Sequence, residues 1–242
     1  LVMADTRRRT GTKVSLESTI KVIQLFRQRV CFEDLNHQFL IDFEKWLKED
    51  YKAANNTVIK HLRHLRTLVN EAIKQKYMKP EDYPFKDFKL KPMARKEVFL
   101  TPSELHKVEQ YQGEKGNVVD VFLFACYTGL RFSDIQTLTD KHIIKERGKV
   151  WLIKETVKSN ETVRLPLYLL FEGKAVGLLQ KYGNAEEIAG LARKNINMQL
   201  KKVITGLGIE KKVTLHTARH TFATLNRSDR HPLVQQQRGK GM

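Results

Sequence analysis

Two short motifs hold residue types suited to chemistry on a phosphate. Residues 215–222 read Leu-His-Thr-Ala-Arg-His-Thr-Phe and residues 128–131 read Thr-Gly-Leu-Arg, which supply Arg131, His216 and Arg219. An arginine stays charged in a protein and presents a planar fork of donors, so two converging arginines can grip a phosphate. A neighbouring histidine can donate to a phosphate oxygen or exchange a proton near neutral pH. The pattern indicates phosphodiester chemistry on nucleic acid.

The composition favours an anionic partner. Lysine and arginine total 44 against 27 aspartate and glutamate, which gives a net charge of +17 over 242 residues. Nucleic acid is the leading candidate for the partner of so basic a chain, and a ribosome-like or merely soluble basic protein is the competing interpretation. No stretch approaches the about 20 apolar residues that span a bilayer, so no membrane partner is expected.

Neither the cysteines nor the paired histidines predict a metal site. Cys31 and Cys126 are the only cysteines, and we expect both in apolar helical surroundings. Two lone thiols give no disulfide framework and no zinc pattern, which fits a reducing cytoplasm. His216 and His220 are four residues apart, but Thr217 stands where the H-E-x-x-H zinc motif needs glutamate. We therefore expect no metal and no other cofactor.

The elements that must position these residues begin with a small helical domain at 15–79. Residues 1–14, with three consecutive arginines, predict a basic flexible arm, and a plain solvated tail is the alternative. Apolar residues at helical spacing predict helices near 15–30, 39–47 and 58–72, the last with a cap among residues 55–57. The last helix also carries a polar side that suits a phosphate backbone or plain solvent, formed by Lys60, Arg63, His64 and Arg66.

Residues 80–100 contain three prolines in a lysine-rich run and predict a basic linker. A mixed domain is expected at 101–225. It opens with a capping box from Thr101 to Glu104, and its apolar helix at 118–127 is expected to end at a left-handed Gly129. We expect Ser133 to cap the next helix. Short strands near 143–144, 150–153 and 162–165 then precede helices at 188–200 and 217–225. The fold class is mainly α with a small antiparallel β-sheet.

The order of these features resembles the tyrosine recombinases, specifically the integrases of mobile elements, from about residue 15 to residue 225. The resemblance implies a helical core-binding domain followed by an α/β catalytic domain. It implies that Arg131, His216 and Arg219 contact the scissile phosphate, and that Lys158, in the second turn of the sheet, protonates the leaving 5′-oxygen. It also implies supporting roles for Asp134 and His220. A helix cap for Arg131 and a plain turn lysine for Lys158 are the alternatives.

The function implied by the resemblance is site-specific recombination for DNA integration. Members of the family cleave and rejoin duplex DNA through a 3′-phosphotyrosine intermediate, and they work as tetramers on paired sites.

This sequence departs from the family after the second motif. Its last tyrosine is Tyr182, so no nucleophile follows the H-x-x-R motif, and the usual L-G-H motif is missing. Residues 226–242 are polar and predict a disordered tail. We therefore hypothesise a truncated or frameshifted C-terminus, and we expect this chain to bind DNA without cleaving it. A noncatalytic or regulatory DNA-binding fragment and an RNA-binding protein are the alternatives.

Overall fold

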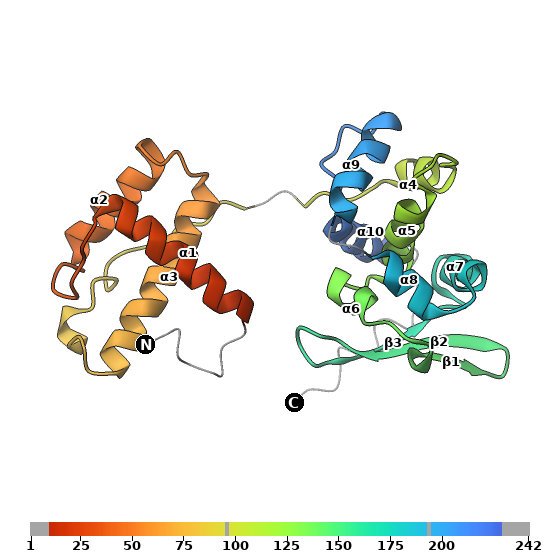
Figure 1. Cartoon of the computed structure of the whole chain (residues 1–242), viewed down its shortest axis with the longest axis horizontal. Helices are drawn as coiled ribbons and strands as arrows, with labels where there is room; N and C mark the ends of the chain where they lie inside the picture. The colour runs from red at the N-terminus through yellow and green to blue at the C-terminus, as the bar shows by residue number, and fades with distance from the viewer. Residues whose placement is uncertain (1–9, 95–96, 193–194, 229–242) are drawn as a thin grey trace. The chain divides into compact units, whose positions relative to one another are not determined.

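The computed structural model describes residues 10–94, 97–192 and 195–228. The chain forms two compact units, Leu1–Arg95 and Lys96–Met242 (Figure 1). The first is helical and the second combines helices with a small sheet, so the predicted fold class is confirmed.

The N-terminal unit packs three helices around an aromatic-rich core. They are α1 (Thr10–Phe26), α2 (His37–Glu49) and α3 (Asn55–Lys74), followed by the short η2 (Pro80–Asp82). Phe39 and Phe43 of α2 are buried, and the Trp46 ring stacks 6.2 Å from that of Phe43. Each helix is amphipathic, so burial of its apolar side supplies most of its stability.

Three local predictions for this unit are wrong. Helix α1 begins at Thr10, inside the predicted arm, and ends at Phe26 rather than near residue 30. The chain then turns, and the Asp34 carboxylate accepts from the Cys31 backbone N–H at 2.8 Å, so Cys31 is exposed in a loop and not in a helix. Helix α3 is capped at Ala54, and no side chain of residues 55–57 caps it.

The segment predicted as a linker contributes to both cores. Phe85 is buried in the N-terminal unit, whereas Leu100 is buried in the C-terminal unit. Apolar side chains within the lysine-rich run have therefore been drawn into the neighbouring cores. Residues 1–9 of the predicted arm and residues 229–242 of the predicted tail lie outside the described residues. Residues 226–228 belong to the last helix, which ends at Ser228, so the predicted start of the tail at residue 226 is wrong.

The C-terminal unit is built around α5 (Gly116–Thr128), which is buried from Val118 to Thr128. Five helices pack against this central helix: α4 (Pro102–Glu109), α7 (Lys174–Tyr182), α8 (Ala185–Leu191), α9 (Ile196–Gly206) and α10 (Leu215–Ser228). The single helix predicted at 188–200 is wrong, because Ala192 leaves helical geometry with ψ of 74° between α8 and α9. The predicted capping box at Thr101 is confirmed.

The sheet is a three-stranded antiparallel meander in the order β1 (Ile143–Glu146), β2 (Lys149–Glu155) and β3 (Thr162–Pro166). Its hairpins confirm the three predicted strands. Arg164 on β3 places its guanidinium 4.8 Å from the Trp151 ring centre on β2. Leu152 is fully buried beneath the sheet, which fixes the register because a slip of one residue would expose it.

Within the described ranges, no helix is both long enough and apolar enough to cross a bilayer.

Candidate functional site

Arg131 lies in the tight connection between α5 and α6 (Phe132–Gln136), as the sequence predicts. Gly129 caps α5 with φ of +64°, the left-handed conformation that glycine adopts most easily. A Cβ built on Gly129 would lie 2.5 Å from the Phe222 ring of α10, so the glycine also lets α10 approach. Arg131 follows as the N-cap residue of α6. Its position is therefore fixed by two helix ends and by α10.

The same connection binds Arg219 of α10. The Arg219 guanidinium donates from Nη1 to the Gly129 carbonyl oxygen at 2.7 Å. Burial lowers the pKa of Arg219, and the nearby Arg131 charge lowers it further, while Asp134 opposes both effects. The two guanidinium groups are thus close enough to repel each other. An anion between them would relieve that repulsion.

His216 lies one turn before Arg219 on α10, on the exposed side. Its pKa is lowered by partial burial first and then by the charges of His220, Arg219, Arg131 and Lys158. All four groups therefore lie within electrostatic range of one imidazole. We call Arg131, Lys158, His216 and Arg219 the cationic cluster. The structure brings together all four residues that the sequence analysis predicts to be catalytic.

Asp134 links the two backbone segments that carry Arg131 and Lys158. Its carboxylate is fully buried and accepts from the Arg131 backbone N–H at 3.3 Å and from the Val157 backbone N–H at 2.8 Å. The first contact makes Asp134 part of the N-terminal cap of α6, so the predicted cap at Ser133 is wrong. The second contact anchors the turn between β2 and β3. Asp134 thus contacts both segments through their backbone N–H groups.

Lys158 is one of the exposed residues of that turn. The turn is closed by the Thr156 N–H donating to the Glu161 carbonyl at 2.9 Å and by the Asn160 N–H donating to the Thr156 carbonyl at 3.0 Å. Because the turn backbone is fixed by these bonds and by Asp134, the lysine has a rigid base and a free end. That combination suits a side chain that must reach a ligand.

His220 lies behind His216. The two rings meet edge to face at 4.7 Å between centres, and His220 Nδ1 lies 3.6 Å from a Glu97 carboxylate oxygen. The described residues contain no group of three or more histidine, cysteine or acidic side chains arranged to hold a metal ion.

The cationic cluster has an unbalanced charge. Among the described residues, Arg131, Lys158 and Arg219 form no ion pair with a carboxylate. Asp134 is the buried acid nearby, and its oxygens already accept from two backbone donors. Unpaired charges of one sign that lie beside one another in a folded protein typically indicate a binding site for an oppositely charged ligand. The geometry suits a phosphate.

A second basic region lies on α3. A groove of about 530 Å³, which we call the α3 groove, is lined by Asn56, Thr57, Ile59, Lys60, Arg63, His64, Thr67 and Met93. Three of the four predicted DNA-binding residues therefore share one groove. Arg66 is exposed on the same helix but does not line it.

Two buried polar residues escaped the sequence analysis. Lys154 of β2 is 5% exposed and donates to the Thr137 carbonyl at 2.9 Å. Alternation along the strand does place Lys154 on the same side as buried Leu152, which was a usable signal. His61 of α3 is also buried, and its place on the apolar side of the helix could have indicated this.

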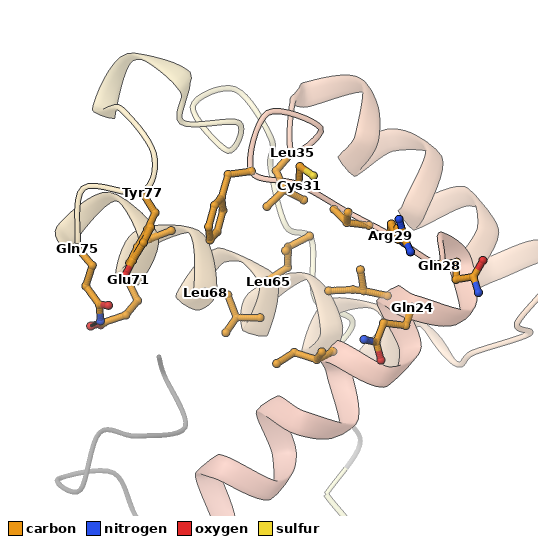
Figure 2. Close-up of a pocket in the computed structure, with 15 residues that line it drawn as sticks. Gln24, Gln28, Arg29, Cys31, Leu35, Leu65, Leu68, Glu71, Gln75 and Tyr77 are labelled. Atoms are coloured by element: carbon orange, nitrogen blue, oxygen red, sulfur yellow. Dashed lines mark hydrogen bonds between the residues drawn. The ribbon is translucent and has the colours of Figure 1, made fainter.

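The N-terminal unit also has an apolar pocket of about 620 Å³ (Figure 2). Leu65 and Leu68 of α3 lie along one side of it, and Gln24 and Gln28 lie toward α1 and the loop that follows it. This pocket is lined by few charged groups and is separate from the α3 groove. It adds no chemistry to the cationic cluster.

A family model described as the phage integrase SAM-like domain matches residues 2–90. No curated protein sequence matches the chain significantly.

Several solved structures share the fold. A lambda integrase dimer bound to a COC′ core site has a TM-score of 0.79 and 16% identity over 98% of this chain and 86% of that one. The Tn1549 transposon integrase in complex with circular intermediate DNA gives 0.69 and 19% over 97% and 87%. The XerH site-specific recombinase bound to a palindromic difH substrate gives 0.66 and 14% over 93% and 71%. The chain thus carries a domain of the phage integrase SAM-like family at its N-terminus and has the fold of the tyrosine recombinases.

Proposed function

We propose that the chain is a site-specific DNA recombinase of the integrase type, which binds duplex DNA and holds one phosphodiester in the cationic cluster. The observation that carries the proposal is the convergence of Arg131, Lys158, His216 and Arg219 from three separate elements. Within the described part of the chain, none of the two arginines and the lysine forms an ion pair with a carboxylate. A surplus of fixed positive charge around one exposed imidazole favours a ligand with several negatively charged oxygens.

The cluster suits cleavage by a tyrosine hydroxyl. The tyrosine oxygen would attack phosphorus while its hydroxyl proton passes to water, the bond from phosphorus to the 5′-oxygen would break, and a 3′-phosphotyrosine would form. Arg131 and Arg219 would neutralise the nonbridging oxygens, where one well-placed donor is commonly worth about 3 kcal/mol. Lys158 would give its proton to the leaving 5′-oxygen, and general acid catalysis contributes about 10²- to 10⁴-fold. His216 would donate to the phosphate.

Two of the seven tyrosines, Tyr127 and Tyr182, are unsuited to be that nucleophile. Tyr182, the last in the sequence, lies on α7 and donates its hydroxyl proton to Asp120 at 2.5 Å. Burial and the Asp120 charge raise its pKa well above the ordinary value. Tyr127 is likewise buried and donates to Glu109 at 2.7 Å. We therefore propose that the 242-residue polypeptide binds DNA but does not cleave it.

The proposed partners follow from the solved structures of similar fold, which include a lambda integrase tetramer bound to a Holliday junction. We propose duplex DNA as the partner of this chain, with contacts from the α3 groove and from the cationic cluster. We propose a tetramer on paired sites for a form that carries the nucleophile.

A suicide-substrate assay tests the proposal directly. A nicked duplex traps any covalent protein–DNA adduct, and we expect binding without an adduct. Fusing a C-terminal segment that carries the tyrosine from one of the structurally similar integrases should give an adduct, and Arg131→Ala in that fusion should abolish it. Binding lost to competing RNA but not to duplex DNA would instead identify an RNA-binding protein.

A noncatalytic DNA-binding protein is the second candidate. It is favoured by the hydrogen bonds that occupy Tyr127 and Tyr182. A fusion that binds DNA with unchanged affinity but never forms an adduct would support this candidate.

A further inference from the structure

A threonine hydroxyl lies between two histidines where α1 packs on α3. Thr19 Oγ1 is 3.0 Å from His61 Nδ1 and 2.7 Å from His64 Nδ1, and it donates to the Ser15 carbonyl oxygen at 3.3 Å. Thr19 and His61 are buried, whereas His64 is half-buried and lines the α3 groove. The hydroxyl therefore joins a histidine at the groove to the interior of the unit.

The protons available limit how these groups can pair. A hydroxyl has one proton to donate and two lone pairs with which to accept. A protonated His64 can donate from Nδ1 to Thr19 and from Nε2 to an acceptor in the groove at the same time. A neutral His64 carries only one of those protons. It must either lose the donor facing the groove or take the Thr19 proton away from the Ser15 carbonyl.

The charges around His64 oppose its protonation while the groove is empty. Its pKa is lowered by burial first and then by Lys60, and the Ser15 carbonyl partly offsets both. Arg63 lines the same groove and His61 lies on the buried side. From α1, the groups against His64 are the uncharged Thr19 hydroxyl and the Ser15 carbonyl. A phosphate beside Lys60 and Arg63 would cancel their repulsion and favour the charged ring.

We propose that Thr19 positions His64 as a phosphate contact in the α3 groove, and that DNA binding there takes up a proton on His64. The inference rests on the proposed function, since it needs a DNA backbone in the groove. It assigns Thr19 a positioning role: the hydroxyl holds Nδ1 inward so that Nε2 faces the ligand.

The test is the affinity for one fixed duplex, measured by fluorescence anisotropy at constant ionic strength between about pH 5.5 and 8. One linked proton changes affinity by at most about tenfold per pH unit. We expect the wild type to bind more weakly as pH rises. His64→Gln and Thr19→Val should each remove most of that dependence, while Thr19→Ser, which keeps the hydroxyl, should retain it.

Other histidines define the controls. His216→Gln should leave the part of the pH dependence that belongs to His64. His61→Gln should change little in this range, because burial lowers the pKa of His61 to about 4. His106→Gln is the matched control, since His106 is a mostly exposed histidine on α4.

The outcomes separate this inference from the proposed function. Full pH dependence in His64→Gln would overturn the inference while leaving DNA binding intact. Failure of the wild type to bind any duplex would overturn the proposed function itself. Should Thr19→Val not fold, the NMR titration of His64 with and without duplex decides the matter, because an unchanged His64 pKa contradicts proton uptake.

Discussion

At the scale of single residues, the molecule keeps several cations and histidines in surroundings that oppose their charge. Burial and neighbouring positive charges lower the pKa values of Arg219 and His216. Burial also lowers the pKa of His61 and so favours its neutral form. Each of these unfavourable free-energy contributions should be removed by binding of a specific ligand or by a change of pH. Their pKa values are therefore direct reporters of the two basic sites.

Inorganic phosphate should raise the pKa of His216. The free imidazole is below its ordinary pKa because of burial and four positive neighbours, and a bound anion cancels those charges. The measurement is an NMR titration of the His216 ring with and without phosphate. Arg219→Lys keeps the charge but loses the planar fork, so we expect it to weaken the effect, and Arg219→Ala to remove it. An equal response in Arg219→Ala would contradict a shared phosphate site.

His61 should make the N-terminal unit sensitive to acid. Its folded pKa of about 4 lies below the ordinary value of 6.5, so the unfolded chain binds more protons between these values. Stability is therefore present above about pH 6.5 and is lost as pH falls through that window, by up to about 1.4 kcal/mol per pH unit. Urea unfolding followed by circular dichroism measures the slope. His61→Gln should flatten it, and an unchanged slope would show that another group titrates.

At the scale of elements, the geometry of the cationic cluster depends on the hydrogen bonds that join α6 to the sheet. Asp134 joins the start of α6 to the turn of Lys158, and Lys154 joins β2 to the Thr137 carbonyl just beyond the end of α6. These hydrogen bonds at opposite ends of the short helix α6 fix the distance between Arg131 and Lys158.

Lys154→Ala should loosen this arrangement. It leaves the Thr137 carbonyl without its donor and removes buried methylenes, so we expect a loss of about 1–3 kcal/mol of unfolding free energy. Hydrogen exchange at the Val157 amide should quicken, because Asp134 is then the one remaining of the two links described between α6 and this part of the sheet. The exposed strand residue Lys149 gives the matched control, Lys149→Ala, which should change neither quantity.

Gly129→Ala tests the junction of α5 and α10. The substitution forces a Cβ onto a backbone with φ of +64° and against the Phe222 ring. We expect a destabilisation of at least about 1 kcal/mol from the backbone alone. Adding Phe222→Ala should recover the steric part only, so the two changes should be non-additive in thermal unfolding. Strict additivity would mean that α10 does not press on this glycine.

At the scale of the whole molecule, the excess of positive charge should govern affinity. Binding of a duplex should weaken with salt, with a log–log slope of about −0.9 for each phosphate neutralised. Arg63→Ala should reduce that slope by about 0.9, if Arg63 contacts one phosphate in the α3 groove. Lys45→Ala on α2, away from the groove lining, should leave it unchanged. Anisotropy titrations at several salt concentrations supply the slopes.

The sequence predicted the parts of this molecule that depend on local chemistry. The capping box at Thr101 and the left-handed Gly129 are determined by neighbouring residues, and both are found in the structure. The grouping of the predicted catalytic residues came from the family resemblance rather than from spacing. The tertiary partners were not predictable: Lys154, His61 and the Thr19 hydroxyl gained theirs only when separate helices and strands packed together.

The two tryptophans of the chain fall one in each unit, Trp46 among the aromatic rings of α2 and Trp151 beneath a guanidinium on the sheet. Intrinsic emission therefore contains one reporter per unit. Trp46→Phe would leave a spectrum that follows the C-terminal unit alone, and Trp151→Phe would leave one that follows the N-terminal unit. The tryptophan fluorescence of the two variants can therefore follow the unfolding of each unit separately, without an attached dye.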